Sequence, residues 1–142
     1  MTRRYLLDTN AISHMMTDAD GAVARRAERS MTGPDSPELC TSIIVQCELT
    51  FGLKKRPSAR LQAALNAQLA GLIVFPLDEA VVAHYASLRA DLEFKGTPIG
   101  PNDALIAAHA LALDATLVSA DAEFLRVPGL RVENWLDAKI EA

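Results

Sequence analysis

The stretch RYLLD (residues 4–8) places a short apolar run directly in front of a carboxylate. Such a run fits a buried strand, and similar short runs recur in LIVF (72–75), ATLVSA (115–120) and LRVENW (130–135). The stretch DSPELCTS (35–42) predicts a turn that leads into one more short strand. Short apolar strands that alternate with helices are typical of a parallel sheet covered on both faces. We therefore expect an α/β sandwich with a central parallel sheet of about five short strands.

The segments between these strands have the spacing and the end residues of helices. The expected helices cover residues 10–31, with an interruption near Asp20 and Gly21, and residues 42–56, 58–72, 78–96 and 101–113. The pair 42–56 and 58–72 is separated by Pro57 and should form an antiparallel hairpin. No repeat or linker interrupts the series, so residues 1–142 are expected to form a single domain.

Composition narrows the class of protein further. The chain is 50% apolar and 23% charged, which excludes a disordered or fibrous protein. Its net charge of −4 provides no general attraction for nucleic acid, so such a partner would need a local basic patch. The two cysteines, Cys40 and Cys47, lack zinc-site spacing and are expected to be reduced core thiols. With neither a leader peptide nor a membrane span in the sequence, we expect a cytoplasmic protein without membrane contact.

Three acids are expected at the ligand-binding edge of the sheet. Asp8 directly follows the first strand, and Asp121 closely follows the strand in 115–120. Open α/β sheets bind ligands at the carboxyl ends of their strands. Asp103 belongs to the first turn of the helix GPNDALIAAHA (100–110), where the helix dipole stabilises a carboxylate. A helix start of this kind is ordinary on its own, but its position also allows Asp103 to face the same crevice.

A fourth acid, Glu48, stands on an otherwise apolar stripe of its helix. Helical spacing groups it with Ile44, Val45, Phe51 and Gly52, which are expected to point inward. An unpaired buried carboxylate costs several kcal/mol, and no basic residue at helical spacing could pair with it. Glu48 should therefore open onto a polar crevice.

Convergence of these acids would require a cation. Carboxylates about 5 Å apart repel each other by roughly 3 kcal/mol per pair at an effective dielectric near 20. A set of oxygen ligands favours a hard divalent ion such as Mg²⁺ or Mn²⁺, to which a substrate phosphate can add. This is the apparatus of metal-assisted phosphodiester hydrolysis. The sequence lacks GxGxxG and P-loop motifs, and DTN (8–10) differs from the Asp-x-Asp of haloacid dehalogenases.

Four segments, in order, resemble the successive motifs of VapC-type toxins of the PIN-domain ribonuclease family. They are YLLDTNAIS (5–13), TSIIVQCELTFG (41–52), PIGPNDALIAAHALALDATLVSAD (98–121) and FLRVPGLRVENW (124–135). The resemblance implies a single PIN domain over residues 1–142, a PIN-like α/β/α sandwich. It also implies Mg²⁺- or Mn²⁺-dependent endonucleolytic cleavage of RNA that leaves a 3′-hydroxyl and a 5′-phosphate. The implied partners are a VapB-type antitoxin, whose tail enters the active cleft, and a second copy in a homodimer or a higher assembly.

The resemblance also assigns residues. Four acids match the metal-site and catalytic positions of the family: Asp8, Glu48, Asp103 and Asp121. Asn10 and Ser119 match polar positions that support the site. The segments IGPND and RVPGLRVENW are similar to the branch whose relatives cut the anticodon region of initiator tRNA, which makes tRNA the expected substrate. Many relatives in this branch have Asn-Asn where this chain has SAD (119–121), and the stretch from there to Phe124 is one residue shorter, so we expect the loop after Asp121 to influence substrate choice.

Cations outside the acidic set are candidates for RNA contact. Lys54, Lys55 and Arg56 cluster where two helices meet, and such a cluster is either a solvated turn or a contact for the RNA backbone. Arg89, on the long helix, could reach a phosphate or pair with an acid of the site. The remaining aromatic and imidazole side chains are expected in packing or surface roles: His14, His84, His109 and Trp135.

Two alternatives to the toxin hypothesis stay open at this stage. A non-catalytic binding module could use the same acidic cleft to hold a basic peptide, and it would bind tightly without metal-dependent turnover. A housekeeping RNA-processing nuclease would share the chemistry but not the antitoxin. A small antitoxin reading frame beside the gene would separate the toxin from the housekeeping enzyme.

Overall fold

The computed structural model describes residues 3–136 and is built on a five-stranded sheet with every strand parallel to its neighbours. The strand order is β3-β2-β1-β4-β5. The strands are β1 (Arg4–Leu7), β2 (Glu38–Ser42), β3 (Ile73–Phe75), β4 (Thr116–Val118) and β5 (Val132–Glu133). The expected number and direction of the strands are confirmed.

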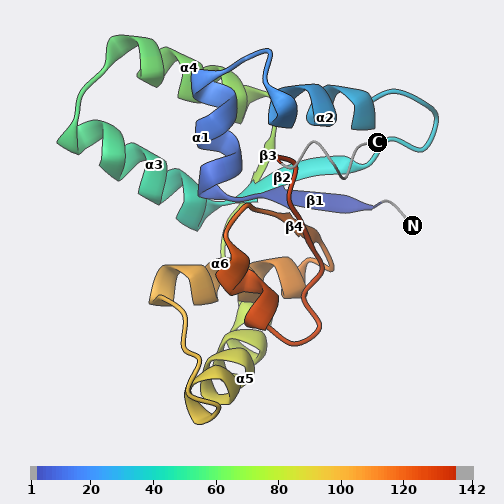
Figure 1. The fold of residues 1–142 in the computed structure, drawn as a ribbon, viewed down its shortest axis with the longest axis vertical. Coiled ribbons are helices and arrows are strands. Elements are labelled where there is room, and N and C mark those ends of the chain that lie inside the picture. The colour runs from blue at the N-terminus through green and yellow to red at the C-terminus, as the bar shows by residue number, and fades with distance from the viewer. Residues whose placement is uncertain (1–2, 137–142) are drawn as a thin grey trace.

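Helices cover both faces of this sheet, as Figure 1 shows. They are α1 (Thr9–Thr17), α2 (Ala22–Ser30), α3 (Ile43–Lys55), α4 (Ala59–Ala70), α5 (Ala80–Phe94) and α6 (Pro101–Ala112). Helices α1, α2 and α4 lie on one side, and α5 packs with α6 on the other. A short 3₁₀ helix, η1 (Ala122–Arg126), follows β4 and was not expected from the sequence. Within residues 3–136 no helix combines the length and apolar character needed to cross a membrane.

The central strand β1 forms the middle of the core. Leu6 and Leu7 are fully buried, because β1 pairs with β2 on one side and β4 on the other, and helices cover both faces. Tyr5 packs against Trp135 with ring centroids 5.2 Å apart, so the expected packing role of Trp135 is confirmed. The apolar run of residues 5–7 therefore decides the fold, since a strand buried on both faces needs apolar side chains on both.

The order of the strands creates a crevice at one edge of the sheet. From β1 the chain passes through α1 and α2 to β2 on one side, whereas β4 lies on the other side of β1. The connections leave β1 and β4 in opposite directions, and this divergence opens a cleft at the carboxyl ends of the two strands. Residues that directly follow β1 and β4 are therefore placed to bind a ligand.

The outer half of α3 departs from the sequence expectation. Val45 is buried as expected and Leu49 is buried too, but Phe51 is 63% exposed, and Gly52 and Cys47 are exposed as well. The reason is that the α3–α4 hairpin projects from the body of the molecule, so only the first half of α3 faces the sheet (Figure 1). The expectations of an inward-facing Phe51 and Gly52 and of a core thiol at Cys47 were wrong.

Two adjacent residues of η1 provide a test of the packing beside the cleft. Phe124 is fully buried whereas Leu125 is 71% exposed. Phe124→Ala should lower the free energy of unfolding by about 3–5 kcal/mol, because it leaves a cavity in the core. Leu125→Ala, the matched control, should change it by less than about 0.5 kcal/mol. Urea denaturation of the two variants measures both values, and equal losses would contradict this packing.

Candidate active site at the carboxyl ends of the strands

Asp8 lies at the centre of the cleft and is held in one orientation. It follows β1 and is only 3% exposed. Ser119, directly after β4, donates its hydroxyl hydrogen to Asp8 Oδ2 at 2.8 Å, and Asn10 Nδ2 donates to the same oxygen at 3.3 Å. Both bonds go to Oδ2, and the other oxygen, Oδ1, is buried without a hydrogen-bond partner among the described residues.

Asn10 and Ser119 also tie the loop after β4 to the start of α1. Asn10 Nδ2 donates to Ser119 Oγ at 3.1 Å, and Asn10 Oδ1 accepts a hydrogen bond from the Ala120 backbone at 3.1 Å. Ser119 Oγ accepts another from the backbone N–H of Asp121 at 3.1 Å. The network joins the ends of β1 and β4 and fixes where Asp121 leaves the sheet.

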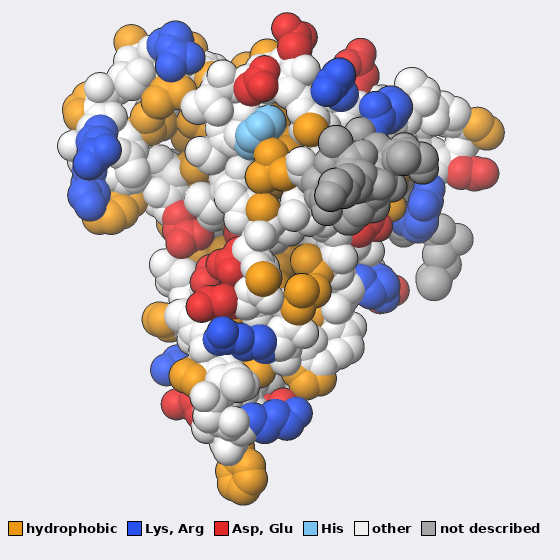
Figure 2. Space-filling model, viewed as in Figure 1, with side chains coloured by type: hydrophobic (Ala, Val, Ile, Leu, Met, Phe, Trp, Pro, Cys, Tyr) orange, Lys and Arg blue, Asp and Glu red, His pale blue; other side chains and the backbone are white. Residues whose placement is uncertain are grey.

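A second group of acids lies beside Asp8. Asp103, Asp121 and Glu123 each place a carboxylate oxygen within 4.8 Å of the others. Asp103 comes from the first turn of α6, and Asp121 precedes η1 and accepts a hydrogen bond from the Glu123 backbone at 2.9 Å. Figure 2 shows acidic side chains gathered at the waist of the molecule, between the α3–α4 hairpin and α5.

Glu48 reaches the site from α3. Its side chain is half-buried, and its Oε1 accepts a hydrogen bond of 2.7 Å from the hydroxyl of Thr9. Thr9 directly follows Asp8, so this bond ties Glu48 to the same turn of chain. The sequence expectation that Glu48 lies in a polar crevice beside the other acids is consistent with this position.

Electrostatic repulsion within the group appears in the proton affinities. Burial, together with the charges of Asp8, Asp121, Glu48 and Glu123, raises the pKa of Asp103 to about 6. Burial also raises the pKa of Asp8, although hydrogen bonds from Thr9 and Ser119 oppose the shift. Carboxylates that come from four separate segments therefore share one electrostatic site.

The donor set fits a hard divalent cation. Asp8 Oδ1 is buried and has no hydrogen-bond partner among residues 3–136. An unpaired buried carboxylate oxygen is costly, and a cation would remove that cost together with the repulsion between the acids. The oxygen-only ligands suit Mg²⁺ or Mn²⁺ rather than softer metals.

A cation on the rim of this group was not expected from the sequence. Arg126, at the end of η1, lies 3.9 Å from Glu123 Oε1 and donates a hydrogen bond of 3.1 Å to the Pro98 carbonyl. Pro98 belongs to the loop that leads into α6 and Asp103. Arg126 therefore joins the segment after β4 to the loop before α6, on the rim of the acidic group.

Arg89 was expected either to contact phosphate or to pair with an acid of the site. It pairs instead within its own helix: its guanidinium donates to the hydroxyl of Tyr85 and lies 3.4 Å from Glu93 Oε2. Among the described residues its contacts thus include none of the four acids expected in the site. Arg89 is exposed, and its contact with an RNA phosphate stays a prediction.

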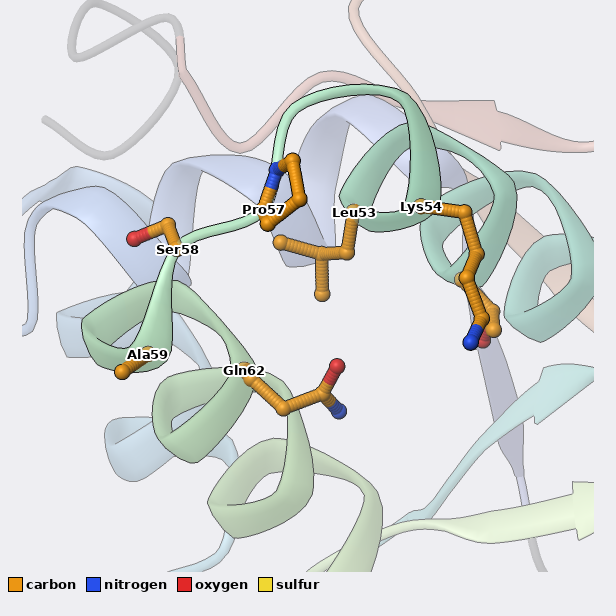
Figure 3. Close-up of a pocket in the computed structure, with 7 residues that line it drawn as sticks. Leu53, Lys54, Pro57, Ser58, Ala59 and Gln62 are labelled. Atoms are coloured by element: carbon orange, nitrogen blue, oxygen red, sulfur yellow. The ribbon is translucent and has the colours of Figure 1, made fainter.

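The basic residues of the α3–α4 turn lie apart from the acids. Lys54, Lys55 and Arg56 are all exposed, and Figure 2 shows Lys and Arg side chains over the outer end of this hairpin. A hollow of about 310 Å³ lies between the two helices, and Lys54 and Gln62 line it with Leu53 (Figure 3). This turn forms a local basic patch on an acidic protein.

Three residues of the site were missed by reasoning from the sequence: Thr9, Glu123 and Arg126. Thr9 could have been suspected, because it stands in the polar run DTN directly after β1. Glu123 and Arg126 depend on η1, whose short turn folds these residues back toward the cleft. A five-residue 3₁₀ helix has too little periodicity to be expected from sequence alone.

Comparison with known proteins gives consistent matches over nearly the whole chain. A model of the PIN domain matches residues 5–130. Ribonuclease VapC2 of Rickettsia felis is 35% identical over 133 residues, covering 92% of this chain and 97% of that protein. The tRNA(fMet)-specific endonuclease VapC of Salmonella typhimurium is 31% identical over 135 residues, covering 93% and 98%. These similarities confirm the resemblance seen in the sequence motifs.

The fold agrees with a solved structure of this group. VapBC2 from Rickettsia felis, bound to a DNA fragment from their promoter, has a TM-score of 0.85 and 34% sequence identity to this chain. The match covers 93% of this chain and 98% of that one. The PIN-like arrangement of the sheet and helices is thereby confirmed.

The raised pKa of Asp103 predicts that the site opposes folding when no cation is bound. Its pKa of about 6 in the folded protein exceeds the value of 3.8 for a free side chain, so stability should be lost as the pH rises through this interval. Asp103→Asn should therefore stabilise the metal-free protein at about pH 7, by about 1 kcal/mol because the side chain is partly exposed.

Thermal unfolding in EDTA, at a pH below the interval and at a pH above it, measures this effect. The advantage of Asp103→Asn should disappear at the lower pH, where the wild-type carboxyl group is also neutral. Asp20→Asn, at an exposed acid between α1 and α2, is the control outside the cleft. A destabilised Asp103→Asn protein at about pH 7 would contradict the repulsion described above.

Proposed function

The chain belongs to the PIN domain family, among the VapC proteins, and from this premise we propose that it is a metal-dependent endoribonuclease toxin. The whole chain, residues 1–142, acts as one PIN domain. The single observation that carries the proposal is the convergence of four acids at the carboxyl ends of β1 and β4: Asp8, Glu48, Asp103 and Asp121. One buried oxygen of Asp8 has no hydrogen-bond partner among the described residues.

The four acids are proposed to hold the catalytic ion, Mg²⁺ or Mn²⁺. Bound there, such an ion supplies Lewis-acid activation of water and stabilises charge that develops on the phosphate oxygens. Asp8 offers its free Oδ1, and Asp103 is kept near the other acids by the start of α6. Glu123 is a further carboxylate within reach of Asp103 and Asp121.

The neighbouring polar residues are proposed to orient the ligands. Ser119 and Asn10 fix one oxygen of Asp8 and so aim the other into the cleft. Thr9 does the same for Glu48. Partners of this kind set the direction of a metal ligand and strengthen it, and their loss commonly weakens metal binding or activity by about 10–100-fold.

The proposed substrate is RNA, and within RNA a tRNA, with the anticodon region of initiator tRNA as the expected target. This assignment rests on similarity to the tRNA(fMet)-specific endonuclease VapC. The proposed backbone contacts are Lys54, Lys55 and Arg56 on the hairpin, with Arg89 on α5. Because these cations lie on both sides of the acidic waist, an RNA strand bound to them would cross the site.

The proposed regulator is a VapB-type antitoxin. The similar chain from Rickettsia felis was solved as VapBC2, a complex with DNA from its promoter. We infer that this chain likewise pairs with an antitoxin in the cytoplasm, as a homodimer or a larger assembly. The acidic cleft favours a cationic side chain of the antitoxin, which would compete with the metal for the same carboxylates.

Substitution of Asp8 tests the proposed catalytic centre. Asp8→Asn should abolish RNA cleavage while the fold is retained, because the variant keeps the side-chain shape and loses the charge that binds the ion. Purified protein without antitoxin is incubated with total tRNA in Mg²⁺, Mn²⁺ or EDTA, and the cut ends are mapped. The exposed Asp20→Asn is the charge-matched control and should cleave normally. Full activity of Asp8→Asn, or cleavage in EDTA, would overturn the assignment.

Removal of the basic patch tests the proposed RNA path. The triple alanine variant of Lys54, Lys55 and Arg56 should raise KM by about tenfold and leave kcat nearly unchanged, because these residues bind phosphate away from the reacting atoms. The dependence of KM on salt should also weaken. Arg25→Ala, which removes an exposed cation from α2, is the control. An unchanged KM and salt dependence in the triple variant would exclude this path.

A further inference from the structure

His109 is a buried polar side chain that the proposed reaction does not use. It lies on α6 and is 2% exposed, and its Nδ1 is 2.8 Å from the hydroxyl oxygen of Ser42, which is itself fully buried. Ser42 stands at the end of β2, so this contact joins two segments that are far apart in the sequence. A pair of polar groups is kept here, inside the core, where apolar packing would be ordinary.

The hydrogen-bond pattern determines the state of the ring. Ser42 Oγ already accepts a bond of 3.1 Å from the Ile44 backbone, so its own hydrogen is free to go to His109 Nδ1. His109 also bonds the backbone of Pro76, which has no N–H and can only accept. With Ser42 as the donor, Nδ1 accepts and the proton of a neutral ring lies on Nε2. Burial lowers the pKa of His109, although the nearby Asp78 opposes the shift.

Ser42 connects this ring to the candidate active site. Its side chain caps the first turn of α3, the helix that carries Glu48. His109 belongs to α6, the helix that begins with Asp103. The contact between Ser42 and His109 thus fixes the start of one acid-bearing helix against the last turn of the other.

The hydroxyl of the preceding residue, Thr41, shows that a side chain at this end of β2 can find a hydrogen-bond partner inside the sheet. Thr41 Oγ1 donates to the Leu7 carbonyl at 2.7 Å, inside the sheet. Ser42 instead reaches out of the sheet to α6. A bond from the sheet to a helix on its face constrains the relative position of the two layers, which a bond within the sheet does not.

We propose that His109 is a positioning residue that acts through Ser42 to hold Glu48 in place opposite Asp103. This role rests on the proposed metal centre and adds a residue outside the ligand set. His109 does not touch the ion or the RNA. It sets the geometry of the carboxylates that bind the ion.

Binding of Mn²⁺, measured by titration calorimetry without RNA, tests this role. His109→Leu fills the site but removes both hydrogen bonds, and it should weaken Mn²⁺ binding by about tenfold. His109→Asn places an acceptor near the position of Nδ1 and should stay within about threefold of wild type. Thermal unfolding is measured for each variant as well. If His109 had a purely structural role, the metal affinity of both variants would follow their stability.

The same measurement in the Glu48→Gln protein shows whether the effect passes through Glu48. His109→Leu should cause no further loss of affinity there, because the ligand that it positions has already lost its charge. A full loss in that background, or wild-type affinity in a folded His109→Leu protein, would overturn the positioning role. Failure of the wild-type protein to bind Mn²⁺ would instead overturn the metal centre, and with it this role.

Discussion

Repulsion between carboxylates that the sheet forces together is the constraint on which the rest of this structure depends. Asp8 cannot leave the cleft, because the strand before it is buried on both faces and Ser119 holds one of its oxygens. Asp103 and Asp121 arrive from the other side of the switch point, and burial with this crowding raises the pKa of Asp103 to about 6. The fold therefore keeps these carboxylates close together despite their mutual repulsion. A bound cation would neutralise that repulsion.

The start of α6 shows how this arrangement is tolerated. Gly100 and Pro101 begin the helix in the ordinary way, and Asp103 lies in the first turn, where the helix dipole favours a negative charge. The structural role and the proposed ligand role thus require the same residue at the same place. Hydrogen bonds from Thr9 and Ser119 stabilise the charged form of Asp8 in a similar way. Local interactions thus stabilise the charged form of each of these two acids, and the repulsion between the acids is what remains uncompensated.

The sequence predicted the elements whose pattern is local and missed those that depend on tertiary geometry. The strands and helices follow from apolar runs and helix ends, so their number and order were expected. The outward orientation of Phe51 was not, because helical spacing describes a face of α3 but not how far the hairpin projects beyond the sheet. Glu123 and Arg126 were missed since their position depends on η1. The hydrogen bond between His109 and Ser42 joins residues far apart in the chain, which no spacing rule relates.

An acidic protein with an RNA substrate must overcome electrostatic repulsion of the RNA, and in this structure the groups that do so are confined to the cleft and its surroundings. The net charge of −4 repels a polyanion at long range, and three acids of the cleft place carboxylate oxygens within 4.8 Å of one another. Neutralisation of these acids by a bound cation would remove the repulsion where a phosphate must approach most closely. The hairpin cations on one side and Arg89 of α5 on the other then need only hold the backbone beside that point. Metal binding and substrate binding are therefore coupled by charge, so a change that disperses the acids should weaken both.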